Sequence, residues 1–288
     1  MMPWFIWKDE KSSDLGLWIS KLPKITRANE KYSTIDIPGR AGSLIMLEGT
    51  DVYESYLKEC KIQTVNTNPR LQQILNWLRG EGEAIFSNEQ DKVYHGRIAS
   101  QVEFDRISND LIQATVQFFV EPFKRSLYPD YDQKTVSSSS ATIYNTGDVA
   151  SKPLITITKS GNSTVNLTIG GQRMSFKHVD GTIIVDCDAR LITRQAAAYN
   201  SSAYYYKNDY AIFTESSVQK LYRFTDSGTG ATLVTNGKRE EITGWDSGTF
   251  MYIWPGEFSG EFISIQPGEA AISLSTGTAV IEPRWRWV

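Results

Sequence analysis

The sequence predicts a mainly β protein with one helix, organised as two domains. Segments that alternate apolar and polar side chains recur along most of the chain, which is the pattern of half-buried strands. Helical periodicity is clear in one place only, and glycine-rich or Asn-Asp turns separate the alternating segments. A length of 288 residues, 40% of them hydrophobic, allows two domains with their own cores. We expect strands and the helix over 1–131, and an all-β sandwich or barrel over 132–288.

The helix is predicted over residues 69–79. Asn68 suits the cap of the first turn, Pro69 fits the first helical position, and Gly80 fits a left-handed exit. An apolar stripe at the helical spacing consists of Leu71, Ile74, Leu75 and Leu78. We expect this stripe to pack on a sheet.

Two long strands are predicted after the helix. In the first, one face carries Tyr94, Ile98, Val102 and Phe104, and the other carries His95, Arg97, Gln101 and Glu103. In the second, Ile112, Ala114, Val116 and Phe118 oppose Gln113, Thr115 and Gln117. Asn109-Asp110 fits a turn between the strands, and Pro122 ends the second because proline cannot donate to the ladder.

The second domain is predicted to follow a boundary region over 124–150, which is rich in turn residues. Residues 163–187 are then typical of a three-stranded meander, with hairpin turns at Gly170-Gly171 and Asp180-Gly181. On this pattern His178 shares a face with apolar residues, which favours a buried or sheet-edge core position over a catalytic one.

Residues 199–245 do not follow this pattern of short strands separated by turns, and they are rich in Tyr, Ser, Asn and Thr. We expect an insertion around 190–250, or a long decorated loop. The candidate contacts for a glycan or a partner protein are Tyr204, Tyr205, Tyr206 and Tyr210. Aromatic faces bind sugar rings and protein surfaces, whereas ordinary sheet packing is the alternative.

The segment Arg284-Trp285-Arg286-Trp287 predicts a closing strand with both tryptophans on one face and both arginines on the other. Stacking on single-stranded nucleic acid is the less favoured interpretation, because these four residues lie in an acidic chain.

Composition excludes several classes of protein. The chain has 30 Lys and Arg against 33 Asp and Glu, a net charge of −3, so we expect no specific nucleic-acid binding. No apolar run approaches the ~20 residues of a membrane span. The N-terminal residues lack a basic leader, so synthesis in a reducing cytoplasm is expected. Cys60 and Cys187 are interpreted as reduced core residues, and we expect no metal or other cofactor.

Catalytic motifs are not evident. The sequence has no GxSxG elbow, no complete GxGxxG loop and no Walker loop. Asp186 and Asp188 are the nearest acid pair for glycoside hydrolysis, although acids at a strand end are the simpler interpretation. We therefore expect a protein that is not an enzyme.

Several segments, taken in order, resemble the distal tail protein (Dit) family of long-tailed siphophages. An aromatic strand opens the chain, and the matching segments of the first domain are Ile35–Gly42, Leu78–Gly80 and Phe118–Lys124. Those of the second domain are Thr142–Gly147, Lys152–Ile157, Gln266–Glu269 and Ile281–Trp285. The resemblance covers most of the chain apart from residues 190–250.

The resemblance implies a virion component at the tail tip, synthesised in the host cytoplasm. An N-terminal β-sandwich with its helix would form a ring, usually a hexamer, that joins the tail tube protein to the tail-associated lysin or tip protein. A C-terminal galectin-like β-sandwich would project outward and can carry receptor-binding proteins. The alternative is a carbohydrate-binding module that recognises a bacterial cell-wall polymer through the C-terminal domain.

Overall fold

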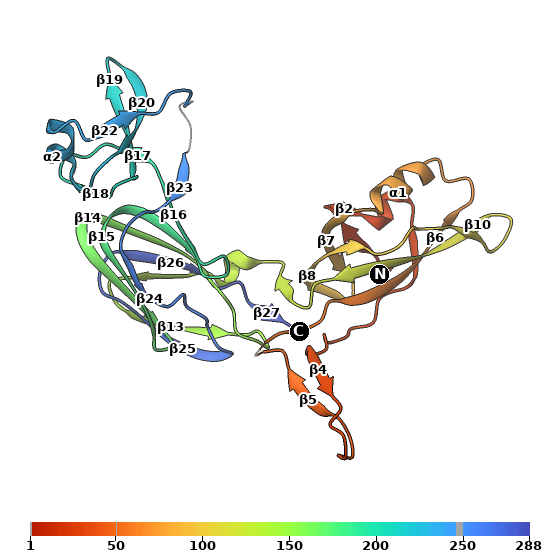
Figure 1. Ribbon diagram of the computed structural model, residues 1–288. Helices are drawn as coiled ribbons and strands as arrows, with labels where there is room; N and C mark the ends of the chain where they lie inside the picture. The colour runs from red at the N-terminus through yellow and green to blue at the C-terminus, as the bar shows by residue number, and fades with distance from the viewer. Residues whose placement is uncertain (1, 50, 246–249) are drawn as a thin grey trace. The chain divides into compact units, whose positions relative to one another are not determined.

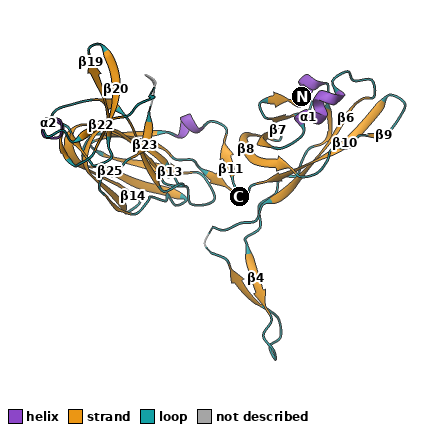
Figure 2. Cartoon of the chain, turned by 45° about the horizontal axis from the view of Figure 1, so that its top comes forward, coloured by secondary structure: helices purple, strands orange, loops and turns teal. Residues whose placement is uncertain are grey.

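The structure, a computed structural model, describes residues 2–49, 51–245 and 250–288 (Figure 1). The protein is mainly β, as predicted. It divides into two compact units. Unit 1 comprises Met1–Tyr128 together with Arg286–Val288, and unit 2 comprises Pro129–Trp285. The expected second domain, 132–288, thus differs from unit 2 at both ends. Strands dominate both units, and the helices are short (Figure 2).

Unit 1 is built on one sheet in the order β2-β1-β7-β8-β10-β6-β3, with β9 paired to β10 and β11 paired to β8 and β27. A separate hairpin joins β4 and β5. The elements are β1 (Phe5–Trp7), β2 (Glu10–Lys11), the 3₁₀ turn η1 (Ser12–Leu15), β3 (Trp18–Lys21), β4 (Tyr32–Ile35), β5 (Leu44–Leu47), β6 (Tyr56–Val65), α1 (Leu71–Trp77), β7 (Glu81–Phe86), β8 (Glu89–Ile98), β9 (Asp105–Arg106), β10 (Leu111–Val120), β11 (Lys124–Ser126) and β27 (Arg286–Trp287).

The helix α1 is present but shorter than expected, because it begins at Leu71 rather than at residue 69. Asn68 caps the turn before it: its side-chain oxygen accepts a hydrogen bond of 2.9 Å from the backbone N–H of Arg70. Gly80 has the expected positive φ, +72°. Ile74 and Trp77 of the helix, together with Leu78 directly after it, belong to the buried cluster of the sheet. The predicted packing of helix on sheet is therefore confirmed.

The strand β10 follows its predicted alternation, with its even-numbered side chains from residue 112 buried. The strand β8 ends at Ile98, so its predicted continuation to Phe104 is wrong. Beyond Ile98 the chain leaves the ladder, and it pairs with β10 again only as β9, in the register Asp105 to Gln113. Val102 is nevertheless buried, because the connecting segment still packs on the core.

Unit 2 contains a nine-stranded sheet that follows the order β12-β26-β14-β15-β16-β23, with β25 and β24 pairing to the far halves of β14 and β15, and β13 pairing to β25. The elements are η2 (Pro129–Asp132), β12 (Lys134–Ser137), β13 (Ser140–Asn145), β14 (Leu154–Ile169), β15 (Gln172–Asp186), β16 (Leu191–Gln195), β17 (Ala197–Ala198), β18 (Tyr204–Tyr205), β19 (Tyr210–Glu215), β20 (Val218–Phe224), β21 (Gly228–Thr229), α2 (Gly230–Thr235), β22 (Arg239–Glu241), β23 (Met251–Ile253), β24 (Phe258–Gly260), β25 (Gly268–Leu274) and β26 (Thr278–Glu282).

The predicted meander over 163–187 is partly wrong. The hairpin turn at Gly170-Gly171 is present, with both φ angles positive. Asp180-Gly181 is not a hairpin turn, because β15 continues through it and pairs along most of its length with β14. A left-handed φ of +53° at His178 reverses the alternation, so Val179 is buried in its place. His178 is half-buried, so the expectation that its side chain shares the buried face with Met174 and Phe176 is wrong.

The segment expected to be an insertion or a long loop folds into a small module. Its four-stranded sheet has the order β17-β19-β20-β22, and β18 pairs with β21 beside the short helix α2. The buried cluster of the module contains Ala203, Tyr205, Ala211, Phe213, Tyr222, Phe224 and Leu233. Residues 246–249 of the expected insertion lie outside the described residues.

The predicted closing strand is shorter than expected and begins after Trp285. Arg284 has a left-handed φ of +54°, which interrupts the alternation that would place both tryptophans on one face. Trp285 is buried in unit 2, whereas Trp287 belongs to β27 of unit 1, where the Lys92 ammonium lies 3.5 Å from its ring centroid. That part of the strand prediction is wrong.

Candidate functional site

A two-stranded hairpin extends from unit 1, and we call residues 32–47 the arm (Figure 1). Backbone hydrogen bonds hold its base, including one of 3.0 Å from the N–H of Glu48 to the carbonyl oxygen of Lys31. The side chains of these two residues also form an ion pair of 2.9 Å. The Glu48 carboxylate raises the pKa of Lys31. Near the tip, Ser43 donates a hydrogen bond to Asp36. The contacts of Lys31 and Glu48 therefore fix the arm at its base.

The arm exposes apolar side chains on both strands. The exposed large side chains are Tyr32, Ile35, Ile37, Leu44, Ile45, Met46 and Leu47. The most exposed are Ile45, at 65%, and Leu47, at 61%. None of these side chains belongs to the buried cluster of unit 1. A solvated hairpin would alternate apolar and polar residues, so this composition indicates a surface that contacts another molecule.

A groove with a volume of about 610 Å³ lies on unit 1, and we call it the N-terminal groove. It is lined by Met2, Pro3, Trp4, Lys11, Ser13, Gly16, Leu17, Trp18 and Ile19. These residues include parts of β2 and β3, the two end strands of the sheet order. Trp18 is 46% exposed, and the Lys11 ammonium lies 4.6 Å from the ring centroid of Trp4. The N-terminal groove is therefore mainly apolar and bordered by strand edges.

A buried ionic cluster lies elsewhere in unit 1. The Glu89 carboxylate is 3.2 Å from the Lys124 ammonium and 3.6 Å from that of Lys58, and it accepts a hydrogen bond from Tyr94. Lys58 also donates to Lys24 O at 3.0 Å. Burial lowers the pKa of Lys58 to about 8 and raises that of Tyr94. Every charge in the cluster has a partner, which indicates a structural role.

The four candidate tyrosines differ in burial. Tyr205 and Tyr206 are buried, whereas Tyr204 and Tyr210 are partly exposed. Tyr204 stacks on His178 with ring centroids 4.4 Å apart, and His178 Nδ1 lies 2.8 Å from Asn162 Oδ1. Accessible ring surface for a ligand is therefore restricted to Tyr204 and Tyr210.

A buried carboxylate connects the module to the nine-stranded sheet of unit 2. Asp209 accepts hydrogen bonds from the Tyr252 hydroxyl at 2.7 Å and from the Tyr206 backbone N–H at 3.0 Å. The Arg194 guanidinium lies 3.5 Å from the same carboxylate. Burial raises the pKa of Asp209, while Arg194 and the two donors act in the opposite direction. The sequence analysis did not identify this network, because its members are far apart in the chain.

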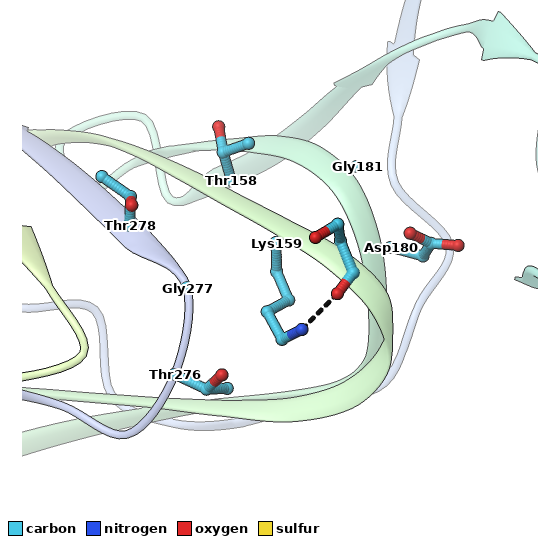
Figure 3. A pocket seen from close by; sticks show the side chains of 8 residues that line it. Thr158, Lys159, Asp180, Gly181, Thr276, Gly277 and Thr278 are labelled. Atoms are coloured by element: carbon cyan, nitrogen blue, oxygen red, sulfur yellow. Dashed lines mark hydrogen bonds between the residues drawn. The ribbon is translucent and has the colours of Figure 1, made fainter.

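A polar pocket of about 420 Å³ lies where β14 and β15 bend (Figure 3). Thr158, Thr276 and Thr278 surround it, together with the carboxylate of Asp180. The Lys159 ammonium donates to the backbone oxygen of Ser160. The pocket offers hydroxyl and charged groups but no aromatic ring to stack on a sugar.

The acidic pair considered for hydrolysis is engaged in structural contacts. Asp186 accepts hydrogen bonds from the backbone N–H groups of Asp188 and Ala189 and lies 3.1 Å from the Arg284 guanidinium. The net effect of these contacts is to lower the pKa of Asp186, against the opposing effect of burial. Asp188 pairs with Lys152 at 3.0 Å. These contacts fit acids that hold a strand end.

Cys60 and Cys187 are free and buried, and burial raises the pKa of each thiol to about 12. This agrees with their interpretation as reduced core residues. Over the described residues, no group of three or more His, Cys, Asp or Glu side chains is arranged to hold a metal ion. In the same part of the chain, no helix has the length and apolar character needed to cross a membrane.

Comparison with known proteins gives a match in structure but not in sequence. No family model matches the chain, and no curated protein matches it. Among solved structures, the chain is similar to SPP1 Dit (gp 19.1), described as a paradigm of the hub adsorption apparatus in phages that infect Gram-positive bacteria. The two share 10% sequence identity, the match covers 98% of each chain, and the TM-score is 0.59. The chain therefore has a Dit-like fold.

Proposed function

We propose that this chain is a structural virion protein, a distal tail hub at the tip of a phage tail. Its copies would form a ring, expected to be a hexamer, between the tail tube protein and the tail-associated lysin or tip protein. The observation that carries the proposal is the fold match to SPP1 Dit over 98% of both chains. On this proposal the protein binds and positions other proteins and catalyses no reaction.

Two features of unit 1 support this role. The arm exposes apolar side chains that would be covered in an assembly. The sheet also ends in edge strands, β2 and β3, which side-by-side copies can protect. Unit 2, which we infer to be galectin-like, would project from the ring and offer a site for receptor-binding proteins.

The test is the solution mass by light scattering, followed by negative-stain imaging of the same peak. We expect a ring with a central opening and a mass near six times that of the 32.5 kDa chain. A monomer at every concentration up to the millimolar range would contradict ring formation by this chain.

A second candidate function is recognition of a bacterial cell-wall polymer through unit 2. The observation in its favour is the partly exposed Tyr204 ring, which lies next to the polar groups of His178 and Asn162. An aromatic face beside hydrogen-bonding groups is suited to a sugar ring.

Binding of purified cell walls to the chain tests this function. Tyr204→Ala should abolish binding, whereas Tyr144→Ala, which removes a tyrosine 64% exposed on β13 of the same unit, should leave it unchanged. Equal binding by both variants would exclude Tyr204 from a glycan site.

A further inference from the structure

We propose that the arm of one copy docks into the N-terminal groove of a neighbouring copy of the same chain. The inference rests on the proposed function, because it assigns the two surfaces that close the ring. It commits to a second copy as the occupant of the groove, and the reasons are the composition, extent and placement of the two surfaces.

The arm requires a partner to be stable in water. Among the described residues, β4 and β5 pair only with each other, and a lone two-stranded hairpin is marginally stable. Both of its outer edges present unpaired backbone groups, and apolar side chains surround them. An uncovered surface of this kind would promote aggregation, so the assembled protein must bury it.

The extent of the arm matches the size of one side of a stable interface. Seven of its 16 residues, 32–47, expose large side chains. A standard protein interface uses about 20–30 residues on each partner. Docking the arm alone would therefore supply more than half of one side of such an interface.

The N-terminal groove has the complementary properties. Its volume of about 610 Å³ accommodates several side chains, and Trp4, Leu17 and Trp18 give it apolar walls. The strands β2 and β3, which border it, each pair on one side only among the described residues. A strand of the arm can therefore add to one of these edges while its side chains enter the groove, which is the general mode of recognition by strand addition.

The arm of one chain cannot dock into the N-terminal groove of the same chain. In both views the arm leaves unit 1 on the side away from α1, and Figure 2 shows the N-terminus beside α1 (Figures 1 and 2). The groove includes the N-terminal residues Met2, Pro3 and Trp4. Two different and complementary surfaces on one molecule give head-to-tail contacts, which close into a ring when the rotation between copies is suitable.

Site-directed cross-linking tests the contact directly. The natural cysteines are buried, so single cysteines can be introduced as Ile45→Cys on the arm and Trp18→Cys in the groove. We expect a short bifunctional maleimide to give a cross-linked dimer when the two variants are mixed, and neither variant alone to cross-link. A chain that carries both substitutions should give a ladder that ends at the size of the ring. Val218→Cys, at a residue 58% exposed on unit 2, is the matched control when mixed with Ile45→Cys.

The outcomes separate this inference from the proposed function. If Ile45→Cys cross-links with itself as well as with Trp18→Cys, the arms pair with each other and the proposal is overturned. In a second test, Ile45→Glu with Leu47→Glu should convert the ring to monomers that keep the circular dichroism spectrum of the parent chain. If the parent forms a ring and this variant does too, arm docking fails while the hub function stands. If the parent forms no ring and no cross-link appears, both fail.

Discussion

Replacing Lys58 by Met should change the stability of unit 1 in a manner that depends on pH. Lys58 is 2% exposed, and burial lowers the pKa of its ammonium from 10.5 to about 8. Between these pH values the unfolded chain binds more protons than the folded chain, so stability rises with pH through this window. The difference, 10.5 minus 8, corresponds to about 3 kcal/mol. Below pH 8 the buried ammonium of Lys58 lowers the free energy of unfolding by this full amount.

The substitution also removes favourable contacts. Lys58 donates to Lys24 O at 3.0 Å and to the Tyr94 hydroxyl at 3.3 Å, and together these bonds contribute about 2 kcal/mol. Glu89 keeps Lys124 at 3.2 Å, so no buried carboxylate is left without a cation. The variant should therefore be more stable than the parent by about 1 kcal/mol at pH 7 and less stable by about 2 kcal/mol at pH 10.5.

Urea unfolding at a fixed protein concentration, followed by tryptophan fluorescence from pH 7 to 10.5, measures this difference. Titratable groups that lie far from Lys58 are common to both chains and cancel when the two free energies of unfolding are subtracted. Lys61→Met, a substitution of a half-buried lysine on the same strand, controls for loss of a lysine as such. A difference between Lys58→Met and the parent that stays constant across the pH range would refute the reasoning.

Two further substitutions test packing in unit 2. Arg194→Met should destabilise the module by about 3–5 kcal/mol, because it leaves the fully buried Asp209 carboxylate without its cation, and limited proteolysis should then cut the module first. Cleavage at the parent's rate would contradict this. Gly260→Ala should cost about 2 kcal/mol more than Gly268→Ala in thermal unfolding. Both glycines have similar positive φ angles, +109° and +96°, but a Cβ at Gly260 would lie 2.1 Å from Arg173 O, whereas at Gly268 it would meet nothing within 4 Å. Equal losses would show that backbone conformation alone decides the cost.

Local sequence patterns correctly predicted those elements whose conformation depends on neighbouring residues in the chain. The hairpin at Gly170-Gly171 was predictable because two adjacent residues with positive φ fit a two-residue turn. Asp180-Gly181 carries a similar signal, but β14 is long enough to pair with β15 on both sides of it. Which strand lies alongside is a property of the whole sheet, and the same residues therefore form a bend instead of a turn.

The candidate functional surfaces were less predictable than the fold. Four consecutive apolar residues at Leu44–Leu47 could have indicated the arm, since they do not alternate and they follow turn residues. The same run is also compatible with a buried strand, and only the structure shows that it is exposed. Conversely, Tyr205 and Tyr206 look like surface residues in a polar segment, yet they pack against Phe224 and Trp254.

The pairing of β11 with β27 determines when unit 1 can complete its fold during translation. The strand β27 belongs to unit 1 but follows the whole of unit 2 in the chain. At about 5–20 residues per second, the ribosome delivers it on the order of ten seconds after the rest of unit 1. Unit 1 therefore reaches its final form only when translation of unit 2 is complete. Nascent chains that stop early would lack this strand, and β11 would then be paired with β8 on one side only.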